Sequence, residues 1–320
     1  MRLGKLSNEQ LERLVLSKYR KTRDEALNVP SVGDDCAVLD VDGDLVVLST
    51  DPITSATGHI GRLSVHINCN DAAAAGAEPI GLLVTLLAPP DATETDIEEI
   101  AAELSETAQG IGVDVLGGHT EVTDSVTRFV TNTTVVARLK KEDRMRGMRA
   151  GDDIICTKWA GLEGSILIAT DFQKRLPMLS DVQLQEVHKW VKYLSVVPEG
   201  RYAAQHGASA MHDITEGGVY GAAWEMSYVA GVGIELDIDA IEVHAITKTI
   251  CDALKLDAMR LLSSGCMLIA CENGKEMVKG LQALGIAASV IGKASGNAGL
   301  RLKNGEQLAP PEADELYKLF

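Results

Sequence analysis

The sequence predicts an α+β protein with two domains. Strand-like and helix-like segments are mixed along the chain, but they alternate too irregularly for a doubly wound parallel sheet or an eight-fold barrel. A length of 320 residues is typical of two domains. The charged run KKEDRMRGMR over 140–149 marks the predicted boundary between them. We therefore expect an N-terminal domain over 1–145 and a C-terminal domain over 146–320.

The predicted elements of the N-terminal half begin with a helix, which a capping box at Ser7 initiates. A mobile segment then extends to residue 30. A long helix with one apolar face begins at Thr93 or Thr95 and ends near Ile111. The other elements are strands over 37–39 and 45–50 joined as a hairpin, an alanine-rich helix over 62–76, and strands over 81–87, 113–116 and 126–139.

The C-terminal half repeats this mixed pattern. A glycine-bearing turn over 159–164 opens a helix, and the segment Thr215-Glu-Gly-Gly218 opens another over 219–230. The remaining predictions are strands over 153–157, 208–213, 234–238, 267–271 and 289–291, with helices over 182–194 and 198–207. We therefore expect a second α+β unit of similar length.

The charge and the apolar content limit the possible partners. The formal net charge is −16, which argues against a nucleic-acid partner or an anionic membrane surface. No run approaches the roughly 20 apolar residues that span a bilayer, and the N-terminus does not resemble a signal peptide. The six cysteines lack zinc-ligand spacing and are expected to be reduced core residues. We expect a cytoplasmic protein whose phosphorylated ligands are met by cations or backbone amides.

Four polar clusters lie at predicted strand ends, turns or helices. They are Gly33-Asp34-Asp35, Ser49-Thr50-Asp51, Asn68-Cys-Asn70-Asp71 and Gly117-Gly118-His119-Thr120-Glu121. Carboxylates suit Mg²⁺, which prefers oxygen ligands and is often completed by substrate phosphates. Paired glycines after a strand leave backbone amides open to a phosphate.

Each cluster also has a purely structural interpretation. Asp34 and Asp35 could form a turn, and Asp51 before Pro52 is an ordinary turn initiator. Asn70 and Asp71 are harder to explain, because both are poor helix formers inside a predicted helix. The chain contains neither a P-loop nor a G-x-G-x-x-G motif after a strand. The residues alone therefore predict a metal–phosphate site without specifying its type.

Five segments in order resemble the ATP-dependent superfamily that includes aminoimidazole ribonucleotide synthetase, thiamine-monophosphate kinase, selenophosphate synthetase and a hydrogenase-maturation carbamoyl dehydratase. The segments are GDDCAVL, STD, NCNDAAAAGAEPIG, GGHTEV and MHDITEGGVYGAAWEM. The resemblance implies an N-terminal domain whose strands form a β-barrel across a homodimer, and a C-terminal α+β domain. ATP would lie in the cleft between the domains.

The resemblance also implies roles for individual residues. Asp34, Asp35, Asp51 and Asp71 would be the Mg²⁺ and phosphate-site carboxylates, with Asp51 and Asp71 closest to the chemistry. Asn70 would orient a phosphate oxygen or a metal-bound water. The remaining nucleotide contacts would come from Gly117, Gly118, Thr120 and Asp213.

Two features depart from the family pattern. His119 stands where several relatives have Asp or Glu, so Glu121 is a candidate replacement ligand; on a strand the two would share a face. His119 could instead donate to phosphate, act as a general base, or be structural. The given sequence also ends in Phe320 rather than the terminal Cys of the hydrogenase-maturation branch.

The expected function is ATP- and Mg²⁺-dependent activation of an oxygen or similar acceptor on a small molecule or partner. Within the superfamily the sequence looks most like the hydrogenase-maturation branch or an orphan relative of aminoimidazole ribonucleotide synthetase. A thiamine-monophosphate-type kinase is an alternative, although GGHT and HDITEGG depart from its usual motifs. A nucleotide-binding regulatory or assembly protein without turnover is the alternative from another class.

Overall fold

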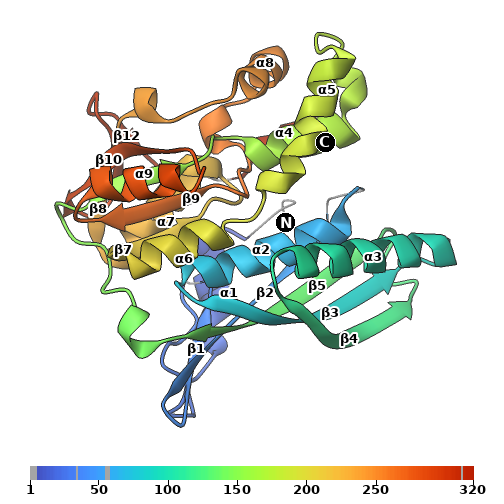
Figure 1. Ribbon diagram of the computed structural model, residues 1–320, viewed down its shortest axis with the longest axis horizontal. Coiled ribbons are helices and arrows are strands. Elements are labelled where there is room, and N and C mark those ends of the chain that lie inside the picture. The colour runs from blue at the N-terminus through green and yellow to red at the C-terminus, as the bar shows by residue number, and fades with distance from the viewer. Residues whose placement is uncertain (1–5, 34, 55–57, 311–312) are drawn as a thin grey trace.

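The computed structural model describes residues 6–33, 35–54, 58–310 and 313–320. Its strands form two separate sheets, one in each half of the chain (Figure 1). The helices are α1 (Asn8–Leu14), α2 (Ile60–Ala74), α3 (Glu94–Gly110), α4 (Leu162–Asp171), α5 (Asp181–His188), α6 (Val197–Gln205), α7 (Gly218–Ala230), α8 (Ala245–Leu254) and α9 (Gly274–Ala283). The strands are β1 (Ala37–Val41), β2 (Asp44–Ile53), β3 (Glu78–Ala88), β4 (Asp114–Val122), β5 (Val130–Leu139), β6 (Asp153–Thr157), β7 (Ala208–Asp213), β8 (Val232–Leu236), β9 (Met267–Cys271), β10 (Ala288–Asn297), β11 (Leu300–Leu302) and β12 (Gln307–Leu308).

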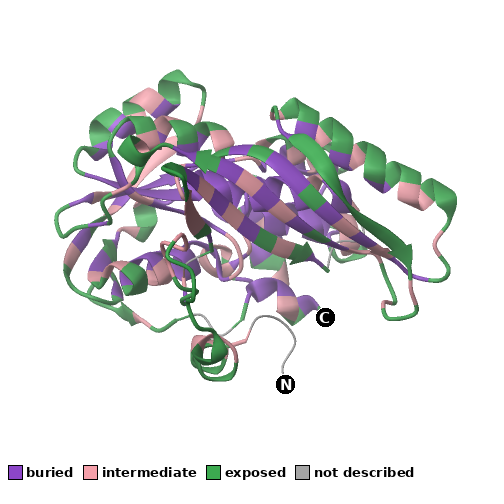
Figure 2. Cartoon of the chain, turned by 90° about the horizontal axis from the view of Figure 1, so that it is seen from below, coloured by how far each residue is buried: buried purple, intermediate pink, exposed green. Residues whose placement is uncertain are grey.

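The first sheet has five strands in the order β1-β2-β5-β3-β4. All neighbours are antiparallel except β3 and β4, which are parallel. Helices α2 and α3 cover one face, so the strands alternate between buried residues on that face and more exposed residues on the other (Figures 1 and 2). Every residue of the edge strand β4 is exposed. The sheet is open among the described residues, and the barrel predicted across a dimer stays a prediction.

The second sheet has seven strands in the order β12-β11-β8-β10-β6-β9-β7. Strand β9, which lies between β6 and β7, is buried along its whole length, because helices lie on both faces of the sheet. One face packs against α6 and α9, and the other packs against α7. The predicted mixed α+β class with a sheet in each half is therefore confirmed.

The two halves meet where α2 crosses α6. Gly200 on α6 lies so close to α2 that a Cβ there would come within 2.4 Å of the Ala73 carbonyl oxygen. Lys158 fixes α6 within the C-terminal half. Its buried ammonium forms an ion pair with Glu199 at 2.6 Å and donates hydrogen bonds to three backbone carbonyls, including that of Tyr193 at 2.9 Å. These contacts give Lys158 a structural role.

Several predicted elements were wrong in extent. Strand β4 continues through Gly117-Gly118-His119-Thr120-Glu121, which was expected to be a turn after a short strand. Gly118 has a φ of 146°, and a Cβ there would lie 1.8 Å from the Val84 carbonyl oxygen, so this glycine allows β4 to pair with β3. Strand β5 begins at Val130 rather than 126. The helix predicted over 182–194 divides into α5 and a 3₁₀-helix, Lys189–Tyr193.

Candidate functional site

Strand β2 and helix α2 hold Asp51 and Asp71 in a fixed relation. The backbone N–H of Asp51 donates to Asn68 Oδ1 at 2.8 Å, and the Asn68 amide donates in turn to the Ser64 carbonyl at 3.0 Å. A second bond joins the same strand and helix: the Ser49 hydroxyl of β2 donates to Asp71 Oδ2 of α2 at 2.6 Å. These side-chain bonds explain why the alanine-rich interior of α2 carries polar residues, which pin the helix to the strand.

A cluster of carboxylates forms around Asp71. Burial raises the pKa of Asp71 well above its usual value, and the negative charges of Asp213, Asp51 and Asp35 raise it further. The hydrogen bond from Ser49 lowers this pKa and only partly opposes the other effects. We call Asp35, Asp51, Asp71 and Asp213 the carboxylate cluster. Three of its members come from the N-terminal half, and Asp213 comes from the end of β7 in the C-terminal half.

His212 is a buried histidine beside the carboxylate cluster, and sequence reasoning assigned it no role. Its Nε2 lies 3.6 Å from Asp35 Oδ2 and 3.3 Å from Glu225 Oε2, and its Nδ1 lies 2.7 Å from the Asp213 carbonyl oxygen. Burial alone lowers the pKa of His212, but the interaction with Glu225 and the charges of Asp35, Glu225 and Asp213 outweigh it and raise the pKa to about 10. The available signal was the His-Asp pair at a strand end.

The donor set of the carboxylate cluster fits a hard divalent cation. Asp35, His212 and Asp213 each offer one ligand atom, and these atoms lie within 4.8 Å of one another. A protonated imidazole does not bind a metal ion, so with the pKa of His212 raised to about 10 the carboxylate oxygens of Asp35 and Asp213 are the better ligands of this group. Like charges that are buried together raise each other's pKa, and a bound cation would relieve this repulsion. Mg²⁺ is therefore compatible with these residues.

A cleft of about 650 Å³ opens between the two halves next to Asp51. The N-terminal side is formed by the end of β2, by α2 and by Arg128, and the other side by α4, the loop before α7 and the C-terminal segment. The lining residues are Asp51, Pro52, Ile53, Thr54, Leu63, Ile67, Arg128, Glu163, Leu167, Thr215, Glu216, Leu262, Ser264, Asp314, Leu316, Tyr317 and Phe320.

Three acidic residues from the C-terminal half line this cleft, and we call Glu163, Glu216 and Asp314 the acidic wall. Asp314 accepts backbone hydrogen bonds from Gly217 and Leu316, each at 2.8 Å. Burial raises the pKa of Asp314 to about 6, although these backbone hydrogen bonds lower it. Glu216 accepts a hydrogen bond from the Tyr317 hydroxyl at 2.9 Å. The backbone N–H of Gly217, at the start of α7, therefore already binds the carboxylate of Asp314.

Not all predicted site residues meet at the carboxylate cluster. Asp34 lies outside the described residues. Asn70 is fully buried and holds the segment that joins α5 to α6: its amide donates to the Leu194 carbonyl and its oxygen accepts from the Val196 N–H, both at 2.8 Å. These bonds occupy the amide that was predicted to orient a phosphate or a metal-bound water. That role stays a prediction.

The glycine-rich cluster on β4 lies apart from Asp51 within one chain. His119 pairs with Thr85 and Glu121 with Leu87 on the face opposite the buried residues Val84 and Leu86. Asp51 instead belongs to the face that α2 covers, together with Ser49. His119 Nε2 lies 3.0 Å from Glu121 Oε2, and both side chains are exposed. The same strand carries Gly117, Gly118 and Thr120.

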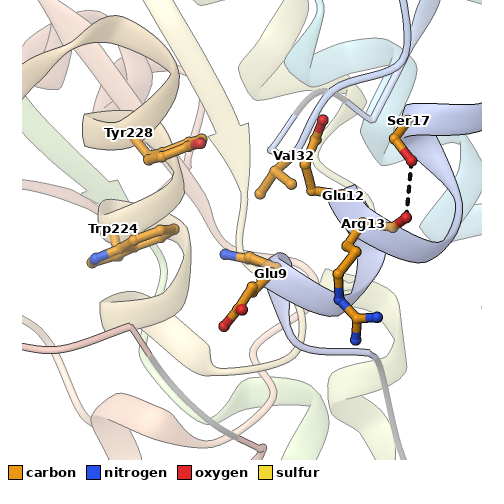
Figure 3. Close-up of a pocket in the computed structure, with 8 residues that line it drawn as sticks. Glu9, Glu12, Arg13, Ser17, Val32, Trp224 and Tyr228 are labelled. Atoms are coloured by element: carbon orange, nitrogen blue, oxygen red, sulfur yellow. Dashed lines mark hydrogen bonds between the residues drawn. The ribbon is translucent and has the colours of Figure 1, made fainter.

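A separate hollow of about 410 Å³ lies between α1 and α7 (Figure 3). Glu9, Glu12 and Arg13 line it from α1, facing the stacked rings of Trp224 and Tyr228 on α7, whose centroids are 5.2 Å apart. It contains none of the predicted site residues, so the candidate site is the interdomain cleft with the carboxylate cluster.

The fold and this site define a class of protein: two α+β domains whose carboxylates converge at the domain junction. The chain belongs to the AIR synthase related protein family, because residues 33–139 match its N-terminal domain and residues 149–303 its C-terminal domain. This confirms the superfamily resemblance. No helix in the described part of the chain is long and apolar enough to cross a membrane.

The similar proteins include several from hydrogenase maturation. A putative hydrogenase expression/formation protein of Methanocaldococcus jannaschii is 29% identical, over 91% of this chain and 88% of its own. The carbamoyl dehydratase HypE of Escherichia coli is 27% identical, over 84% of this chain and 81% of its own. The E. coli HypE structure superposes with a TM-score of 0.75 at 23% identity, covering 86% of this chain and 88% of that one. A HypE structure in complex with ATP superposes with a TM-score of 0.66 at 19% identity, covering 96% of both chains.

Proposed function

We propose that this protein is an ATP- and Mg²⁺-dependent enzyme that uses the γ-phosphoryl group of ATP to activate an oxygen or similar acceptor. The observation that carries the proposal is the convergence of Asp51 and Asp71 with Asp213, from opposite halves of the chain, beside a cleft of about 650 Å³ that Asp51 lines. A bound cation would reduce the repulsion between this strongly anionic chain and an anionic nucleotide.

The roles within the carboxylate cluster follow from burial and charge. Asp35, Asp51, Asp71 and Asp213 would hold Mg²⁺, which when bound supplies charge neutralisation for the phosphate oxygens. Ser49 and Asn68 fix the positions of Asp71 and Asp51, so little reorganisation is needed when the nucleotide binds. His212 supplies a fixed positive charge next to Asp35.

The cleft also favours a particular kind of acceptor. Its C-terminal side combines the acidic wall with the apolar side chains of Leu167, Leu262 and Leu316. Arg128 is the one basic residue among the described residues that line it. Such a wall repels phosphate monoesters, which argues against a thiamine-monophosphate-type kinase. A neutral hydroxyl or carboxamide fits better, as in the carbamoyl dehydratases among the relatives.

We also propose that the protein acts as a homodimer through the open face and edge of the first sheet. Leu116 and Val122 on β4 are 60% and 59% exposed, which is unusual for large apolar residues on a sheet edge. A dimer formed there would cover this edge and bring the His119–Glu121 pair to a partner chain. Analytical ultracentrifugation should give the mass of two chains, and a monomer at micromolar concentration would contradict this assembly.

The function is tested by phosphate release from Mg-ATP, with and without candidate acceptors. Wild-type protein should release phosphate slowly and should gain thermal stability from Mg-ATP. Asp51→Asn should abolish release, whereas Asp252→Asn, an exposed aspartate on α8, should behave as wild type. Binding of ATP without turnover under any acceptor would support the regulatory alternative. The absence of any Mg-ATP effect would reject the nucleotide site.

A further inference from the structure

Glu163 is a buried acid with no assigned role at the cleft. It lies in the first turn of α4 and is only 2% exposed, yet it lines the same cleft as Asp51. Its Oε2 has no hydrogen-bond partner among the described residues. A carboxyl group in such a place is costly for the fold, since burial of an incompletely paired polar atom destabilises the native state. Structural need therefore does not explain it.

The surroundings of Glu163 bring its pKa close to neutral pH. Burial raises the pKa of Glu163 to about 7; the negative charges of Asp314 and Glu216 add to this, and hydrogen bonding with Ser264 lowers it. Cys266 is also near, because the charge of Glu163 raises the pKa of its thiol. Asp51 and Arg128 lie on the opposite side of the cleft. A carboxyl group with a pKa close to the working pH can both accept and release a proton.

We propose that Glu163 is the general base that takes the proton from the acceptor when the acceptor attacks the γ-phosphorus of ATP. This inference rests on the proposed function. A bond forms between the acceptor oxygen and the γ-phosphorus, and the bond from that phosphorus to the β,γ-bridging oxygen breaks, so that ADP leaves with the electron pair. The acceptor proton moves to Glu163 Oε2 and passes to water when the products leave. With water as acceptor the product is inorganic phosphate.

The two sides of the cleft fit separate roles in nucleotide binding and in proton transfer. The carboxylate cluster belongs to the nucleotide end, whereas Glu163 lies on the C-terminal side, where apolar residues and a neutral acceptor would exclude water. Glu216 and Asp314 are poorer candidates, because their carboxylates already accept hydrogen bonds from Tyr317 and from backbone N–H groups. Glu163 has the oxygen left for a proton from a ligand.

The test is the pH dependence of Mg-ATP hydrolysis, with water as the acceptor. Wild-type kcat should rise with pH and level off above about pH 7, because the base must be ionised. Glu163→Gln should lower kcat by about a hundredfold and remove this rise, with KM for ATP changed by less than about twofold. Glu163→Asp should recover part of kcat together with the rise. Circular dichroism and Mg-ATP thermal shifts confirm that each variant is folded and binds nucleotide.

Glu216→Gln removes a different carboxylate from the same wall and should keep a rise in kcat with pH, displaced to lower pH because the charge of Glu216 raises the pKa of Glu163. The inference is overturned if Glu163→Gln keeps the wild-type pH profile, or if its whole effect is on KM. Wild-type turnover without a rise near pH 7 overturns the role of Glu163 alone. The absence of wild-type turnover overturns the proposed function and this inference together.

Discussion

The carboxylate cluster and the acidic wall are both groups of acids at the same domain junction, but they are satisfied differently. In the acidic wall, Asp314 and Glu216 accept hydrogen bonds from backbone N–H groups and from Tyr317. In the carboxylate cluster, Asp71 is buried among three other carboxylates, with one hydroxyl donor from Ser49. Asp314 and Glu216 are satisfied by donors within the chain, whereas the buried carboxylate of Asp71 fits a cation from outside. A group of acids therefore does not by itself indicate a metal site. The number of hydrogen-bond donors that the chain provides to those acids is the better guide.

The largest expected effect concerns the carboxylate cluster. Asp71→Asn should abolish the stabilisation by Mg-ATP, which in the wild type is about 2.7 kcal/mol at a ligand concentration of a hundred times Kd. The same substitution should make the ligand-free protein more stable at neutral pH, because it removes a buried charge while Ser49 keeps an acceptor. Thermal unfolding with and without Mg-ATP measures both effects. A variant that is less stable without ligand yet still responds to Mg-ATP would contradict the comparison.

The second prediction concerns Glu163, the member of the acidic wall that is least well paired. Folded Glu163 keeps its proton up to about pH 7, whereas its ordinary pKa is 4.5. The stability contributed by this retained proton is complete below about pH 4.5 and is lost as the pH rises through about 7. Glu163→Gln stays neutral throughout, so its advantage over wild type in the free energy of unfolding should grow from pH 5 to pH 8, by at most roughly 3 kcal/mol. Urea unfolding at both pH values measures it, and a constant difference would show that Glu163 titrates normally.

A smaller effect is expected from Asp314, whose carboxylate satisfies the start of α7. Asp314→Ala should lower the free energy of unfolding by about 2 kcal/mol, because the buried Gly217 N–H loses its acceptor. Denaturant unfolding measures the loss. Asp252→Ala, at an exposed ion pair with Lys248, should change it by less than about 0.5 kcal/mol. Equal effects of the two substitutions would mean that the acidic wall is not held by its internal donors.

The smallest effect is expected on β4. Glu121→Gln should change the free energy of unfolding by less than about 1 kcal/mol, because its pair with His119 is solvent-exposed. Chemical denaturation checks this value. If the same substitution weakens the response to Mg-ATP, the nucleotide site includes β4 of a partner chain, since within one chain Glu121 and Asp51 lie on opposite faces of the sheet. An unchanged response would leave the carboxylate cluster as the complete cation site.

The sequence determined the chemistry and the local elements. Periodicity predicted most helices and strands, because an apolar face of α3 or a buried strand such as β9 must repeat along the chain. Two poor helix formers inside α2 showed that Asn70 and Asp71 serve something other than the helix. The ordered polar motifs were sufficient to place the chain in its superfamily, since each motif combines residue type with position.

The tertiary structure decided which of these residues meet. Local patterns cannot show that Asn70 binds the segment 194–196 while its neighbour Asp71 joins Asp213, because both contacts cross the domain junction. They also cannot show that the paired glycines continue β4, since that depends on how closely β3 approaches. The role proposed for Glu163 depends on burial and on neighbours more than 50 positions away. Long-range packing determines how deeply each acid is buried and how many hydrogen-bond donors surround it. These two factors set its pKa and so its charge.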